Sequence, residues 1–341
     1  MAQVETIRGP IDVASLGTTL MHEHVFVLSE EIRQNYPSGW DEDLRIAHAG
    51  RQLNKATGRG IGTIVDPTVI GLGRDIRRIQ RVAELTDITI IVATGLYTFT
   101  EAPFYFRYRG RRSGSDGEDP MTDMFVTDIT AGIAGTGVKA AFLKCAIDEA
   151  GLTRGVERVL RAVARAHVLT GAPVTVHTHP ASQSGLVALR VLREEGADLS
   201  RVVIGHSGDG ADLLYLAEIA DAGCLLGMDR FGENGPPFLD QRADTVAAMC
   251  HRGYAGSMVL SHDAACYIDW FDHDEDGAGN YTYIHDAVLP ALAERGVTPE
   301  QIETMLVTNP RRYFTPPADP SGAGDATAGR RTSRDSGWAR P

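Results

Sequence analysis

The chain has 341 residues, of which 43% are hydrophobic and 23% are charged, and its formal net charge is −12. This composition is ordinary for a globular protein with a large core, so disorder of the whole chain is excluded. The excess of acidic residues argues against nucleic acid as a partner.

The N-terminus and the cysteines predict a cytoplasmic protein that does not contact a membrane. No segment approaches the ~20 uninterrupted apolar residues of a membrane span. Residues 1–5 lack the basic and apolar regions of a signal peptide. Four cysteines, none in a C-x-x-C pair, lie mostly in apolar runs, which indicates buried free thiols in a reducing compartment. They are Cys145, Cys224, Cys250 and Cys266.

Strand-like and helix-like segments alternate along the chain. Apolar runs bounded by turn-forming residues predict eight strands. These runs cover 18–24, 61–66, 88–94, 138–146, 173–178, 201–206, 222–228 and 257–262. Amphipathic patterns, several opened by Asp, Ser or Thr and closed by Gly, predict helices between and after them. These patterns cover 42–58, 74–86, 121–135, 153–170, 183–195, 210–222, 238–252 and 284–296.

This alternation predicts an α/β fold, a (β/α)8 TIM barrel over residues 1–316. A doubly wound sheet is the competing architecture. No G-x-G-x-x-G follows the first strand, however, and the phosphate-binding motif G-x-x-x-x-G-K-[ST] is absent. The barrel is therefore the favoured prediction.

Two segments depart from the alternating pattern. Residues 97–119 form a long excursion after the third strand, and its aromatic residues between 99 and 108 are typical of a core edge or a subunit contact. They favour a homodimer. Residues 317–341 are rich in Pro, Gly, Ala, Ser and Arg without apolar periodicity, which predicts a disordered tail.

Lys144 lies inside the apolar run 138–147, where an ammonium group must be paired, neutralised or used chemically. It could instead reach solvent at the strand end or pair with Asp148. Other metal-binding residue types stand at the ends of other predicted strands. They are His22, His24, His177, His206 and Asp263. Because catalytic groups of a parallel barrel gather at the C-terminal strand ends, this set predicts a two-metal site.

Two divalent ions ~3.5 to 4 Å apart need a bridging anion, and carboxylates are scarce at these strand ends. A desolvated, neutral lysine amine can react with carbon dioxide to give a carbamate, which is a carboxylate on a long stem. Lys144 is therefore predicted to supply the bridge.

The residues resemble those of the phosphotriesterase family of the amidohydrolase superfamily. Residues 17–25, Gly-Thr-Thr-Leu-Met-His-Glu-His-Val, look like that family's first signature. Lys144, His177, His206 and Asp263 follow in the family's order, and the resemblance runs from about Gly9 to Pro316.

The resemblance implies that His22, His24 and Asp263 hold one metal ion and that His177 and His206 hold the other. Carboxylated Lys144 and a hydroxide would bridge two ions of Zn, Co, Fe or Mn. Asp263 is also expected to accept the proton of the attacking water. A helix N-cap is the alternative role for Asp263.

Residues 95–97, 228–231 and 263–270 are similar to the lactonase branch of that family. This similarity implies that Tyr97 touches the ester oxygen and that Arg230 orients the pocket. As alternatives, Tyr97 caps the third strand, and Arg230 pairs with Asp229 or Asp263. The aromatic residues of 264–283 would line a pocket for an acyl chain.

The sequence therefore predicts a hydrolase that opens lactones, such as N-acyl-homoserine lactones in quorum quenching or other γ/δ-lactones. Weak phosphotriesterase activity is expected beside it. A phosphotriester or another ester as the main substrate is the rival within the same class. A non-catalytic barrel stabilised by metal is the rival from another class, although a structural site would close its coordination shell.

Overall fold

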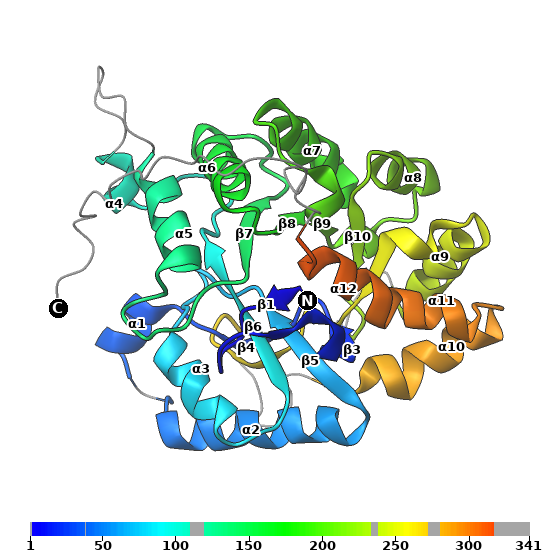
Figure 1. Cartoon of the computed structure of the whole chain (residues 1–341), viewed down its shortest axis with the longest axis horizontal. Coiled ribbons are helices and arrows are strands. Elements are labelled where there is room, and N and C mark those ends of the chain that lie inside the picture. Colours follow the sequence, from blue (N-terminus) through cyan, green and yellow to red (C-terminus); the bar gives the residue numbers. More distant parts are fainter. Residues whose placement is uncertain (1, 38, 110–118, 233–237, 272–279, 317–341) are drawn as a thin grey trace, which may run out of the picture.

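The computed structural model describes residues 2–37, 39–109, 119–232, 238–271 and 280–316. An eight-stranded parallel sheet forms its centre, and helices surround it (Figure 1). In hydrogen-bonded order the strands are β3 (Thr18–Leu20), β5 (Ile61–Asp66), β6 (Thr89–Gly95), β7 (Phe142–Ile147), β8 (Val174–Thr178), β9 (Val202–Gly205), β10 (Leu225–Met228) and β11 (Met258–Leu260). The predicted (β/α)8 barrel is confirmed.

The barrel closes between β3 and β11 by contacts beyond the ends of these strands. The amide of Asp263 donates to the carbonyl of His22 at 3.1 Å. The amide of His22 donates to the Ser261 hydroxyl at 2.8 Å. This seam lies beside the residues predicted to bind metal, so local changes there reach both the closure of the barrel and the site.

All but one of the larger outer helices bury an apolar face against the strands, and the exception is α1 (Glu30–Asn35), which has no buried residue. In chain order the larger ones are α1 (Glu30–Asn35), α2 (Glu42–Gly58), α3 (Ile76–Ala83), α5 (Pro120–Thr130), α6 (Arg154–Thr170), α7 (Ser184–Glu194), α8 (Leu213–Asp221), α9 (Leu239–His251) and α10 (Leu289–Glu294). Helix α6 shows how one of these helices begins and ends. The Thr153 side chain accepts a hydrogen bond from the amide of Val156 at its start, and Gly171 ends it in a left-handed conformation with φ 71°.

The predicted strand 18–24 is wrong in its second half. The chain leaves the barrel after Leu20, and His24 begins β4 (His24–Val27), which pairs in parallel with β12 (Ala265–Ile268). An apolar run cannot distinguish one long strand from two short strands separated by a bend, because both show the same residues.

Several elements at the two ends of the chain were not predicted. The N-terminus forms an antiparallel pair, β1 (Gln3–Val4) with β2 (Ile11–Asp12). The C-terminal part continues through α11 (Pro299–Glu303), the π-helical segment η7 (Thr304–Thr308) and α12 (Asn309–Phe314). The buried Tyr313 and Phe314 of α12 pack into the apolar cluster at the N-terminal side of the barrel.

The four cysteines are buried free thiols, as predicted. Within the described residues, no helix is both long and apolar enough to cross a membrane. The predicted disordered tail, 317–341, and part of the excursion, 110–118, lie outside the described residues.

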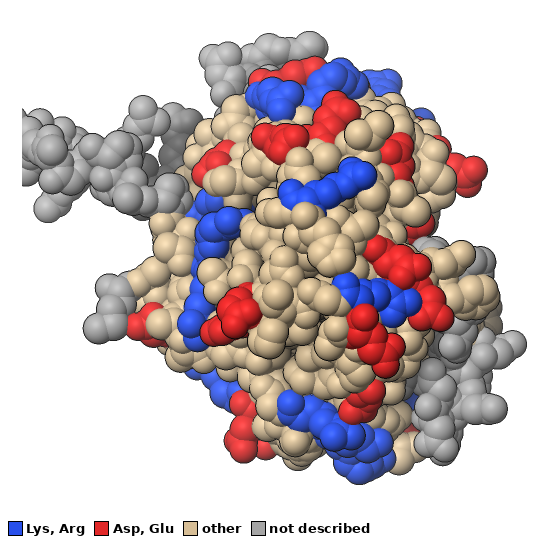
Figure 2. Space-filling view, turned by 90° about the vertical axis from the view of Figure 1, so that its right-hand side faces the viewer, with Lys and Arg blue, Asp and Glu red and all other residues tan. Residues whose placement is uncertain are grey.

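Acidic and basic side chains are interspersed on the face shown in Figure 2. Some oppositely charged side chains at the protein surface form ion pairs. Arg295, for example, contacts Asp240 at 2.8 Å and Asp244 at 2.6 Å on α9. Exposed pairs of this kind add little to stability.

Candidate metal centre

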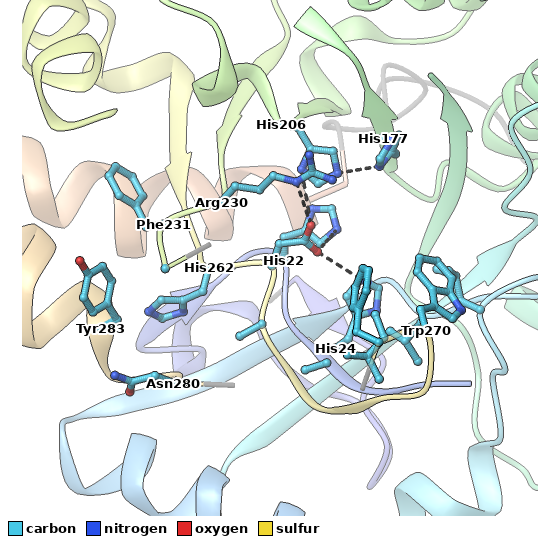
Figure 3. Close-up of a pocket in the computed structure, with 18 of the residues that line it drawn as sticks. His22, His24, His177, His206, Arg230, Phe231, His262, Trp270, Asn280 and Tyr283 are labelled. Atoms are coloured by element: carbon cyan, nitrogen blue, oxygen red, sulfur yellow. Dashed lines mark hydrogen bonds and ion pairs between the residues drawn. The ribbon is translucent and has the colours of Figure 1, made fainter. Parts of the chain in front are cut away.

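The six predicted metal ligands converge at the C-terminal end of the barrel (Figure 3). They come from several strands and the bends after them, and His22 and His24 share one bend. His22 and His24 flank the bend after β3, and Lys144 lies within β7. His177 lies in β8, whereas His206 and Asp263 follow β9 and β11.

Three ligand atoms around Asp263 have the spacing of a single metal site. His22 Nε2 and His24 Nε2 each lie 3.4 Å from Asp263 Oδ1. Ligand atoms at ~2.1 Å from one tetrahedral ion stand about 3.4 Å apart, so these three atoms fit around one ion. His22, His24 and Asp263 therefore form one of the groups that could hold a metal.

His177 and His206 form the second pair of donors. His177 Nδ1 lies 2.7 Å from His206 Nε2. The opposite nitrogen of each ring faces a carboxylate: His177 Nε2 bonds Asp148, and His206 Nδ1 donates to Asp229 at 3.0 Å. The two inner nitrogens then present lone pairs to each other, an arrangement that needs a cation or a proton between them.

Acceptors also fix the tautomers of His22 and His24. His22 Nδ1 donates to Asp229 Oδ2 at 2.9 Å, so one carboxylate holds both His22 and His206. His24 Nδ1 donates to Thr68 Oγ1 at 2.7 Å, and that hydroxyl bonds Asp66. Metal-binding histidines commonly donate their second N–H in this way, which orients the ring and leaves the other nitrogen free.

Lys144 is 1% exposed, and its Nζ lies 3.2 Å from His22 Nε2. It therefore does not reach bulk solvent, and Asp148 bonds His177 in place of Lys144. Burial lowers the pKa of Lys144 to about 8. A buried amine of this kind carries a larger neutral fraction near neutral pH than an exposed lysine does.

The protonation states suit metal binding. Burial lowers the pKa values of His22 and His206, and lowers that of His177 to about 4, so the rings are neutral near pH 7. Burial by itself would raise the pKa of Asp263. The neighbouring His22, His206 and Arg230 outweigh that effect and hold the pKa well below its usual range. The donors are thus neutral imidazoles and a carboxylate, as divalent metals require.

Arg230 contacts the carboxylate of Asp263, as one of its alternative roles suggested. Its Nε donates to Asp263 Oδ2 at 3.1 Å, and its Nη1 donates to Asp209 Oδ2 at 2.9 Å. Asp209 also accepts from Arg242 at 2.8 Å. Asp263 has a left-handed φ of 58° and begins no helix, so the structure gives no support to the N-cap alternative.

The hydroxyl of Tyr97 lies 3.1 Å from His177 Nδ1. Burial raises the pKa of this phenol, so the O–H group stays protonated and available as a donor. Tyr97 lies two residues after the end of β6, and its amide donates to the carbonyl of Ile70. The side chain thus stands beside the donor cluster while its backbone secures the end of the strand.

A cavity of about 930 Å³ opens above the donors. Its wall combines residues that follow different strands, as Figure 3 shows for Phe231, Trp270 and Tyr283. The predicted pocket residues Tyr267 and Tyr281 take other places, because Tyr267 packs against Trp40 and Tyr281 is buried. The loop's acidic residues, 272–276, lie outside the described residues.

Three groups that orient the donors were not singled out from sequence as supporting residues. They are Asp229, Asp148 and the Thr68–Asp66 pair. Asp229 and Asp148 follow strands β10 and β7 directly, which is the one signal the sequence offered. A position directly after a strand does not indicate which histidine a carboxylate will contact.

The chain is similar to several known proteins. The model of the phosphotriesterase family matches residues 2–314. A phosphotriesterase homology protein of Mycobacterium tuberculosis is 57% identical over 320 residues, which cover 92% of this chain and 98% of that protein. An aryldialkylphosphatase of Saccharolobus solfataricus is 38% identical over 311 residues, covering 89% and 97%. The solved structure of a phosphotriesterase from Mycobacterium tuberculosis matches with a TM-score of 0.88 at 55% identity, covering 92% and 98%.

Proposed function

This chain belongs to the phosphotriesterase family and is a metal-dependent hydrolase, and we propose that its main substrates are lactones with a hydrophobic arm. N-acyl-homoserine lactones and other γ/δ-lactones have this form, and their hydrolysis would be a quorum-quenching activity. Phosphotriester hydrolysis would be a weaker, promiscuous activity of the same site.

The continuity of the cavity with the donor cluster carries this proposal. The donors, Tyr97 and Arg230 line the same cavity as seven larger apolar side chains. Those side chains are Val27, Leu72, Phe231, Leu239, Ile268, Trp270 and Phe271. A polar reacting group with a flexible apolar arm matches such a wall, because the arm loses contact with water as it binds.

The donor set supports two divalent ions bridged by carboxylated Lys144. His22, His24 and Asp263 would hold one ion, and His177 and His206 the other. When bound, the ions would activate the attacking water and polarise the carbonyl group. The neutral amine of Lys144 would add to carbon dioxide and lose a proton, which leaves an anion in a cluster otherwise built from neutral rings and Asp263.

The other residues of the site would bind and move protons. Asp263 would accept a proton from the attacking water and pass it to the alkoxide that leaves as the ring opens. Water and lactone thereby give one hydroxy acid. Arg230 would hold Asp263 in place from the second oxygen, and Tyr97 would donate to an oxygen of the ester.

The test compares kcat/KM for a series of acyl-homoserine lactones with that for an aryl phosphotriester, on protein loaded with cobalt, zinc or manganese. We expect the lactones to be hydrolysed more efficiently, and a chelator to abolish both activities. A phosphotriester that is turned over better than every lactone would favour the rival substrate. The aryldialkylphosphatase relative gives that rival its specific support. Absence of metal-dependent turnover of every ester would favour a non-catalytic barrel.

We also propose that the chain forms a homodimer through the excursion after β6. Helix α4 (Phe104–Arg107) carries Phe104, which is 70% exposed and stacks on the exposed Tyr108 at 6.0 Å. Exposed aromatic pairs are typical of protein interfaces. Sedimentation of the wild type and of a Phe104→Ser/Tyr108→Ser variant tests this, because loss of the dimer in the variant alone would support it.

A further inference from the structure

The buried carboxylate of Glu23 has no role in the proposed chemistry, although it lies between His22 and His24. Its side chain is 0% exposed, and four hydrogen bonds point at it. Oε1 accepts from the Ser261 hydroxyl at 2.7 Å, from the His262 amide at 2.9 Å and from His262 Nδ1 at 2.6 Å. Oε2 accepts from the Ala264 amide at 3.0 Å. All four donors come from the segment that carries Asp263.

These bonds hold the backbone on both sides of Asp263. Glu23 accepts from the amides of His262 and Ala264, and the amide of Asp263 itself donates to the carbonyl of His22. Residues 22 and 23 thus bind three successive amides. Asp263 has a left-handed backbone, which residues other than glycine rarely adopt, so the segment needs outside support to keep this conformation.

The same network reaches the far end of the cavity wall. His262 Nδ1 donates to Glu23, so its Nε2 is free to accept, and it accepts from the amide of Ile284 at 2.8 Å. Ile284 begins the helical segment η6 (Ile284–Val288), directly after Tyr283 in the cavity wall. Figure 3 shows His262 between the histidine cluster and Asn280 and Tyr283.

We propose that Glu23 is a positioning residue that clamps the backbone on both sides of Asp263 and thereby holds Asp263 against the metal site. Its anion fixes Ala264 directly and Ile284 through His262. The expected effect of Glu23 on kcat rests on the proposed function, whereas the hydrogen bonds of the clamp do not depend on it.

Three variants of the full chain test the clamp. In Glu23→Gln, one amide oxygen keeps the three donors of Oε1, and the new NH₂ group faces the Ala264 N–H as donor against donor. In His262→Phe, the ring volume stays and both hydrogen bonds of the imidazole are lost. Asn309→Ala is the matched control, because buried Asn309 holds the other end of β11 through the carbonyls of Ala255 and Met258.

Hydrogen exchange of the metal-free proteins, followed by mass spectrometry of short peptides, is the first readout. In Glu23→Gln we expect exchange at Ala264 to accelerate by about tenfold or more, the effect of losing a buried bond to a charged group. In His262→Phe, exchange should accelerate at the Ile284 amide and not at the Ala264 amide. In Asn309→Ala, exchange should change at neither amide. Unchanged exchange at Ala264 in Glu23→Gln would overturn the proposal. If that variant does not fold, unchanged exchange at Ile284 in His262→Phe would overturn it.

Kinetics and metal content form the second readout. At saturating metal, kcat of Glu23→Gln should fall by about tenfold or more while KM for a short lactone changes little, and zinc bound at limiting concentration should fall. Asn309→Ala should lower the melting temperature without these effects. If Glu23→Gln and Asn309→Ala lose the same stability and both keep the wild-type kcat, Glu23 contributes to stability alone and the positioning role is wrong. Should the wild type hydrolyse no lactone while the exchange pattern holds, the proposed substrate fails and the clamp stands.

Discussion

The donor cluster and the apolar wall of the cavity are built in different ways. The donors stand in or shortly after strands and are buried except for Asp263, which is 14% exposed, and each histidine ring is held by an acceptor on its far side. The wall comes from the small β4–β12 sheet and from segments beyond the barrel strands, and Trp270 and Phe271 remain 44% and 63% exposed. One region is fixed by directional bonds, whereas the other makes contacts without direction. Changes in the cluster should therefore affect every substrate, and changes in the wall should affect some substrates more than others.

Removal of Lys144 should break the cluster most severely. In Lys144→Ala the bridging anion is lost, and we expect most of the bound metal and nearly all activity to be lost with it. Metal analysis and kcat/KM for a lactone measure the effect, and a short carboxylic acid should restore part of the activity. Lys139→Ala is the matched control, since Lys139 lies in the same run but its side chain is 39% exposed and contacts Glu5 at 3.6 Å. Density for a free ammonium at Lys144 beside two bound metals would contradict the bridging role.

Replacement of Asp263 should have the next largest effect. Asp263→Asn keeps the shape of the side chain but cannot take up a proton, and it binds metal more weakly. We expect the hydrolysis rate to fall by ~10²-fold or more with metal in excess. Full activity of Asp263→Asn at saturating metal would show that its carboxylate does not act as the base.

Asp229 should matter through the two rings that it holds. In Asp229→Asn the NH₂ group faces either His22 Nδ1–H or the His206 N–H groups, so one ring must change tautomer and turn a protonated nitrogen toward the metal. We expect metal affinity or activity to fall by about 10- to 100-fold. Asp128→Asn is the control, because Asp128 is also buried but pairs with Arg74. Equal losses in the two variants would assign the effect to stability alone.

Changes in the wall should be smallest and should depend on the substrate. If the wall binds the acyl arm, each added CH₂ improves kcat/KM by up to roughly 0.8 kcal/mol, about fourfold, until the cavity is full. Trp270→Ala or Phe271→Ala should flatten this trend more than it slows a short lactone. Phe104→Ala, outside the cavity, should leave the trend unchanged. A wild type that is indifferent to chain length would contradict the hydrophobic-arm proposal.

The sequence was sufficient for the parts that depend on local pattern. Alternating apolar runs and amphipathic segments predicted the barrel, because periods of two and of 3.6 residues are properties of the chain itself. The strand ends identified the residues that converge at the site, because a parallel barrel brings those ends to one face. The sequence alone also singled out Lys144 as a functional candidate, because it is a lysine within an apolar run.

Only the tertiary structure decided which partners these residues have. Sequence did not show that Asp229 joins His22 to His206 across more than 180 residues, or that Glu23 reaches the amides around Asp263. Nor did it show that the strand after Thr18 ends at Leu20, where the chain bends to form a second small sheet. These features depend on contacts between segments far apart in the chain. The direction of a buried side chain is set by the groups that pack around it. A local sequence pattern contains no information about those groups when they come from distant segments.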